Sequence, residues 1–192
     1  MCRSGIVKNL LNSGHNVSVW NRTTDKVRDF VEAGAREALT PSDVIADSDI
    51  TFSCVADPQA AKDLVFGNCG VLQEINTTKV GYFNALKNIF KHRCYYLNCL
   101  QGYVEMTGID SETSQDIAEA ISLKGGRYLE AQIQGSKTQA QDGTLVILVS
   151  GDRSLFDDCQ SCFQVSQEAA IRLAVSDNIS KLFRKENISF KR

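Results

Sequence analysis

Long apolar runs and an excess of charge of one sign are both absent from the sequence. No apolar run approaches the roughly 20 residues that a membrane-spanning helix needs. The opening MCRSGIVKNLL lacks the apolar core and cleavage site of a signal peptide. The 21 Lys and Arg nearly balance 23 Asp and Glu, for a net charge of −2 at pH 7. We therefore expect no membrane span, no secretion and no direct binding of nucleic acid.

A cysteine pattern typical of a disulfide framework is also absent. The seven cysteines are odd in number and irregular in spacing, so reduced thiols in the cytoplasm or the nucleus are expected rather than a disulfide framework. Cys159-x-x-Cys162 has no second cysteine pair at ligand spacing. Because it falls inside a predicted helix, we interpret it as helix packing and expect no metal site.

What the sequence does contain is an alternation of helical and strand patterns. In the first half, helices are predicted over 4–13, 23–35 and from Pro58 onward, and strands over 15–22 and 49–56. Thr40-Pro41-Ser42-Asp43 has the cap, proline and acid of a helix start. The residues expected to face inward are Ile6, Val7, Leu10 and Leu11 in the first helix and Val27, Phe30 and Val31 in the second.

The second half repeats the alternation. Strands are predicted over 103–108, 127–135 and 144–152, and helices over 110–126, with Ile117, Ala120 and Ile121 inward, and over 153–163. This order predicts an α/β fold with a doubly wound, mostly parallel sheet of the Rossmann type. We expect one domain over 1–175, followed at 176–192 by the start of a further helix.

One stretch, at about 80–102, fits neither neighbour. It is rich in aromatic residues and cysteine and has no clear period, whereas a connection at this point normally takes two to six residues. Two origins stay open for it. One is a genuine insert forming an exposed loop, and the other is a translated intron.

Three segments carry a resemblance to a known family. SGIVKNLLNSGHNVSVWNRT resembles the start of the β-hydroxyacid dehydrogenase superfamily, to which the 3-hydroxyisobutyrate dehydrogenases belong. DITFSCVADPQAAKDLVFGNCGVL and GTLVILVSGDRSLFDDCQSCFQ are similar to the dehydrogenase-like domains of N-PAC-type nuclear proteins, the glyoxylate reductase 1 homologues. The resemblance implies an NADP-binding Rossmann domain. Its N-PAC-type branch implies a catalytically inert core that associates with a second copy or a full-length homologue.

The resemblance also implies a cofactor site. The family's first strand and glycine loop precede the match, and only Gly5 is retained of the glycines that approach the pyrophosphate. We therefore expect a fold truncated at both ends, with the neighbours of that strand left unpaired. Asn21, Arg22 and Thr23 match the turn that selects NADP, where an arginine binds the 2′-phosphate; a solvated loop arginine is the alternative.

Two further loops follow from the same comparison. Val55 lies in the loop 54–58. In the family this loop lies along the cofactor; the alternative is an ordinary strand-to-helix connection. Thr107 takes the family's serine position at the substrate, and Gly108 replaces a threonine beside the nicotinamide. Gln132 and Gln134 replace a proline and a substrate-binding serine, and Gly135 and Ser136 remain at the substrate-binding segment.

The family's catalytic lysine has no equivalent. The segment SDNISKLFRKEN places Phe183 at the lysine and Asn187 at its partner asparagine, and phenylalanine cannot transfer a proton. Lys181 is two positions away on another helix face. We expect an NADP-binding domain fragment without catalysis. One alternative is an active NADP-dependent reductase of glyoxylate or a similar aldehyde acid, with Lys181 as the acid. Another is a chromatin-associated scaffold or oligomerisation module.

Overall fold

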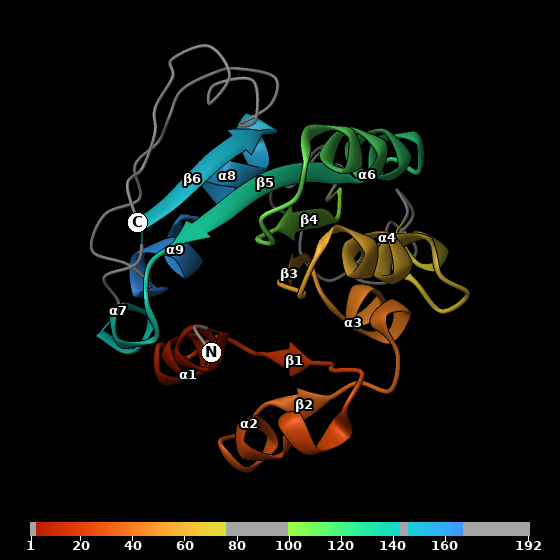
Figure 1. The fold of residues 1–192 in the computed structure, drawn as a ribbon. Coiled ribbons are helices and arrows are strands. Elements are labelled where there is room, and N and C mark those ends of the chain that lie inside the picture. Colours follow the sequence, from red (N-terminus) through yellow and green to blue (C-terminus); the bar gives the residue numbers. More distant parts are fainter. Residues whose placement is uncertain (1–2, 76–99, 143–145, 167–192) are drawn as a thin grey trace, which may run out of the picture.

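A computed structural model describes residues 3–75, 100–142 and 146–166 (Figure 1). Its strands form two sheets. Ser18–Val19 (β1) and Arg36–Glu37 (β2) pair in parallel. The second sheet has the order β3-β4-β5-β6, from Ile50–Ser53, Gly102–Glu105, Arg127–Gln134 and Val146–Gly151. The first three of these strands are parallel and β6 is antiparallel to β5. The fold is the predicted Rossmann-type α/β fold.

The helices occupy the segments between the strands. They are α1 Arg3–Asn12, η1 Thr24–Lys26, α2 Arg28–Glu32, α3 Pro41–Asp47, α4 Pro58–Phe66, η2 Val71–Gln73, α6 Ser111–Leu123, α7 Lys137–Asp142, α8 Arg153–Asp158 and α9 Gln160–Ser166. Local chemistry sets their starts. Thr40 and Asp43 form the predicted capping box of α3, and the carboxylate of Asp57 accepts the amide of Ala60 at the start of α4.

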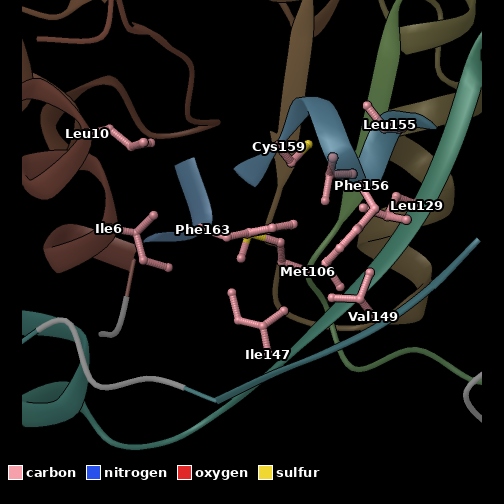
Figure 2. Packing of buried hydrophobic residues seen from close by; sticks show 12 residues of the cluster. Ile6, Leu10, Met106, Leu129, Ile147, Val149, Leu155, Phe156, Cys159 and Phe163 are labelled. Carbon is pink, nitrogen blue, oxygen red and sulfur yellow. The ribbon is translucent and has the colours of Figure 1, made fainter. Parts of the chain in front are cut away.

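One face of the four-stranded sheet packs against α1, α8 and α9. Figure 2 shows this core, in which Leu129, Ile147 and Val149 from the strands and Met106 after β4 lie together with Phe156 and Phe163. Ile6 and Leu10 of α1 join it, as predicted, while Val7 and Leu11 turn toward Val19 and Val27 beside the small sheet. Helix α1 therefore connects the two sheets through their apolar clusters.

The opposite face packs against α3, α4 and α6. Its buried members are Ile45, Ala61, Val65, Val71, Ile75, Tyr103, Ile109, Ile117, Ile121 and Tyr128. Gln101 is buried here too, and its amide donates to the carbonyl oxygens of Ile45 at 2.6 Å and Ser48 at 3.2 Å. Residues 100–102 thus belong to the fold. The rest of the atypical stretch lies outside the described residues.

Several local predictions need correction. The predicted helix over 23–35 is broken into η1 and α2, and Val31 is 38% exposed because the small sheet covers only the side of Val27. Ala118 rather than Ala120 packs on the second core. The helix over 153–163 is interrupted at Cys159, which caps α8.

The division into two sheets agrees with the expectation of unpaired neighbours. Within the described residues, β1 pairs only with β2, and β3 pairs only with β4. An ion pair of 2.7 Å between Arg36 of β2 and Asp47 of α3 connects the small sheet with the segment that precedes β3. Both side chains are well exposed, so this ion pair adds little stability.

Candidate functional site

The candidate site is the edge where the parallel strands β3 and β4 end beside the middle of β5. Because Ser53, Glu105 and Glu130 are register partners, the segments 54–57 and 106–108 emerge there together, while β5 continues to Gln134 beside β6 before 135–136 follow. Open α/β sheets bind their ligands in the crevice outside this edge. Three of the residues predicted from the sequence, Val55, Thr107 and Gly108, therefore lie at this edge, while Gly135 lies beyond it after the end of β5.

Val55 and Thr107 are in direct contact. The amide of Val55 donates to Oγ1 of Thr107 at 2.9 Å. Thr107 is only 4% exposed, and its amide donates to the carboxylate of Glu105 at 2.9 Å. The hydroxyl that was predicted to bind substrate therefore joins the end of β4 to the loop after β3. A role toward substrate stays a prediction.

A buried carboxylate beneath this contact was missed by the sequence analysis. Glu105 is fully buried, and its Oε2 accepts the phenolic hydroxyl of Tyr103 at 3.0 Å. Burial raises the pKa of Glu105, while hydrogen bonds from Thr107 and Tyr103 oppose the rise. Burial, together with the Glu105 charge, raises the pKa of Tyr103 as well. The one available signal was an acid inside the otherwise apolar segment YVEM.

Gly108 and Gln132 are neighbours at the same edge. A β-carbon added to Gly108 would lie 3.1 Å from Nε2 of Gln132. Gly108 itself is exposed. The amide side chain of Gln132 therefore lies where a side chain at position 108 would project.

Gly135 and Ser136 follow β5 as an exposed turn. Gly135 has a φ of 149°, a backbone conformation that favours glycine. Ser136 and Gln139 bond each other reciprocally, from the Ser136 amide to Oε1 at 2.8 Å and from the Gln139 amide to Oγ at 3.3 Å. In this structure Ser136 starts α7, a helix that the sequence analysis did not predict.

The turn after β1 contains Asn21, Arg22 and Thr23. Oδ1 of Asn21 accepts the amide of Thr23 at 3.0 Å, which shapes the turn. Arg22 is exposed, and no carboxylate among the described residues pairs with it. Its guanidinium is thus available to an anion.

The remaining predicted residues lie at or beyond the limits of the described chain. Gly5 is buried in the first turn of α1. Lys181, Phe183 and Asn187 lie outside the described residues, so their roles stay predictions.

A cavity of about 370 Å³ lies elsewhere, at the other end of β5. Ser114, Tyr128, Glu130 and Asp152 are among its lining residues, together with Arg127, whose guanidinium is 2.6 Å from the carboxylate of Asp158. Two acids and a neutralised arginine disfavour the phosphates of a dinucleotide. This cavity is therefore a poor candidate for a dinucleotide.

The described residues offer neither a metal site nor a membrane span. In residues 3–75, 100–142 and 146–166, no three His, Cys, Asp or Glu side chains are grouped so as to hold a metal ion. The helices of the same residues include none with the length and apolar character to span a membrane. Cys159 is fully buried in the first core beside Cys162, in agreement with the packing interpretation.

The fold and this edge define a nucleotide-binding domain, and comparison with known families gives its class. The model for the NAD binding domain of 6-phosphogluconate dehydrogenase matches residues 4–82 and 84–174. The chain belongs to this family of NAD-binding domains.

Several curated relatives carry the name cytokine-like nuclear factor N-PAC. The protein of Aedes aegypti is 56% identical over 178 residues, and that of Homo sapiens is 43% identical over 179 residues. Each alignment covers 93% of this chain but 28% of the relative. The chain thus spans little more than a quarter of these relatives.

Solved structures confirm the fold. Psf3 in complex with NADP+ and 2-OPP aligns with a TM-score of 0.76 at 20% identity, covering 93% of this chain and 56% of that one. A 3-hydroxyisobutyrate dehydrogenase of Salmonella typhimurium aligns with a TM-score of 0.74 at 15% identity, covering 94% and 56%. The expected likeness to 3-hydroxyisobutyrate dehydrogenases is therefore confirmed at the level of the fold.

Proposed function

We propose that this chain is an NADP-binding module that does not catalyse hydride transfer by itself. The NAD-binding family supports a nicotinamide dinucleotide as ligand, and the NADP+ complex of a structural neighbour supports the phosphorylated form. NADP supplies a hydride donor or acceptor when bound. The residues of this chain bind and orient it.

The observation that carries the proposal is the exposed Arg22 at the end of β1. An arginine there can form two parallel hydrogen bonds with a 2′-phosphate. Because no described acid neutralises Arg22, its full charge faces the ligand. NAD lacks that phosphate, so Arg22 favours NADP over NAD.

The absence of catalysis rests on one position. Phe183 stands where the resemblance puts the proton-transferring lysine. A phenylalanine there supplies no acid for the substrate carbonyl oxygen.

Arg22→Ala tests the cofactor assignment. We expect binding of NADPH to weaken about 10- to 100-fold, the range for losing charge-assisted hydrogen bonds, while binding of NADH stays unchanged. Isothermal titration of the full chain measures both. Arg28→Ala is the matched control, since Arg28 is an exposed arginine of α2 paired with Asp25 at 2.8 Å. Equal NADPH affinity in wild type and Arg22→Ala would contradict the assignment.

A second candidate is an active reductase in which Lys181 supplies the proton. Lys181 lies two positions from Phe183 in the sequence. NADPH oxidation with glyoxylate or succinic semialdehyde tests it. The proposal expects no turnover above that of an Arg22→Ala control. Turnover that Lys181→Ala abolishes would establish the reductase instead.

The relatives' name, a nuclear factor, supports a third role as a nuclear scaffold that associates with a second copy or a longer homologue. Sedimentation of the chain alone and mixed with such a homologue measures that association. A monomer in both experiments would contradict it.

A further inference from the structure

A row of polar side chains crosses the sheet beneath α6. Ser53, Glu105, Glu130 and Ser150 are register partners on β3, β4, β5 and β6, and each is at most 8% exposed. Their neighbours one residue along β4, Val104 and Met106, belong to the apolar core on the other face. The sheet thus has one apolar face and one face with a polar row.

Glu105 is the member of this row that reaches the site edge. Its Oε1 accepts the amide of Thr107 at 2.9 Å, and Oγ1 of Thr107 accepts the amide of Val55 at 2.9 Å. Its Oε2 is held by the hydroxyl of Tyr103 at 3.0 Å. Two hydrogen bonds in sequence therefore connect a fully buried carboxylate with the loop after β3.

Stability alone is a weak reason for a carboxylate at this position. Burying a carboxylate costs free energy even when hydrogen bonds compensate for part of it, and well-packed apolar replacements of buried charges are often neutral or stabilising. What an apolar side chain cannot do is fix the direction of the Thr107 amide. Orientation of the turn is thus the property that the carboxylate adds.

We propose that Glu105 is a positioning residue for the dinucleotide: acting through Thr107, it holds the backbone of the loop 54–57 in the shape that receives the cofactor. The inference rests on the proposed function. In this proposal Glu105 touches no ligand but fixes the orientation of the Val55 backbone toward the cofactor. The Thr107 hydroxyl helps to orient the same loop.

Paired variants of Thr107 and Glu105 test the proposal. Thr107→Val keeps the shape and removes the acceptor of the Val55 amide, while Thr107→Ser keeps the hydroxyl. Glu105→Leu removes both acceptors, while Glu105→Gln keeps an oxygen for the Thr107 amide. Ser114→Ala is the matched control, because Ser114 is also buried and its hydroxyl bonds Glu130 at 2.9 Å in the same polar row.

Two quantities are measured on the full chain: the hydrogen-exchange rate of the Val55 amide without ligand, and the dissociation constant of NADPH. We expect Thr107→Val and Glu105→Leu to raise the exchange rate and the dissociation constant about tenfold each, the effect of losing one buried hydrogen bond. Thr107→Ser, Glu105→Gln and Ser114→Ala should stay within about twofold of wild type. A melting temperature that falls in Thr107→Val and Glu105→Leu with both readouts unchanged would overturn the inference.

Failure of the proposed function can be told apart from failure of this inference. If the wild type binds no NADPH, the proposed function is wrong and Glu105 positions no cofactor. The exchange rate of the Val55 amide in Glu105→Leu then still shows whether Glu105 holds the loop.

Discussion

Gly108 and Gln132 face each other at the carboxyl edge of the sheet, with Nε2 of Gln132 3.1 Å from the place that a β-carbon on Gly108 would take. Both residues depart from the pattern of the family that the sequence resembles. The structure brings these two departures next to each other.

This contact predicts how the two positions respond to substitution. Gly108→Thr should lower the free energy of unfolding by about 1 kcal/mol, the lower end of the usual cost of added bulk, since only the flexible end of Gln132 has to move. In a Gln132→Ala background the same change should cost less. A double-mutant cycle in urea measures the coupling. Equal costs in both backgrounds would show that the two side chains do not compete for space.

Glu105→Gln should change how stability depends on pH. The pKa of Glu105 is raised by burial, so the folded state favours the protonated carboxyl. The contribution of the Glu105 side chain to the free energy of unfolding is fully present below the pKa of the unfolded state. It is lost as pH rises through the raised pKa of the folded state. The groups facing it are Tyr103, Tyr128 and Glu130.

The glutamine variant should therefore gain stability relative to wild type as pH rises from the ordinary glutamate pKa of 4.5 toward the raised folded value. Urea unfolding at several pH values measures this difference. Two parallel stability curves would contradict a raised pKa.

The start of α6 should depend on Asp110. Its carboxylate accepts the amide of Thr113 at 2.9 Å and the Thr113 hydroxyl at 2.8 Å. Asp110→Ala should cost about 1 kcal/mol, the usual value of a helix N-cap, and Asp110→Asn much less. Thermal melts of the two variants provide the comparison. An asparagine variant as unstable as the alanine variant would show that the charge, and not the cap, matters.

Hydrogen bonds from the backbone amide and the hydroxyl of Thr113 lower the pKa of Asp110. The contribution of this cap is therefore present above the unfolded pKa and is lost as pH falls through the lowered folded value.

The cysteines should differ in reactivity. Burial, reinforced by neighbouring Cys162, raises the pKa of Cys159 to about 12, whereas Cys69 is exposed. The thiolate is the reactive form, so iodoacetamide should modify Cys69 in the native protein and Cys159 only after unfolding. Mass spectrometry of digests with and without denaturant measures both. Rapid native labelling of Cys159 would contradict its place in the core.

Patterns with a strong physical cause were predictable from the sequence. The capping box of Thr40 and Asp43 and the inward face of Ile6 and Leu10 follow from local spacing, and the structure confirms them. The alternation of strands and helices was enough for the fold class. The prediction that Val31 faces inward was wrong. A helix pattern does not tell how much of the apolar face the neighbouring sheet covers.

The site was predictable only in part. Resemblance pointed to Val55 and Thr107, but their hydrogen bond joins residues 52 positions apart and depends on the register of β3 and β4. The burial of Glu105 arises from α6 packing over the sheet, which no local pattern encodes. The exposed place of Arg22 after β1 follows from the strand pattern, and its role toward NADP stays a prediction.

The central claim is that the chain binds NADP, and a thermal melt of the purified full chain with and without NADPH tests it most directly. A ligand at 100 times its dissociation constant stabilises a folded protein by about 2.7 kcal/mol. The account predicts a single cooperative transition that moves upward with NADPH and much less with NADH at the same concentration. A cooperative transition that saturating NADPH leaves in place would contradict it.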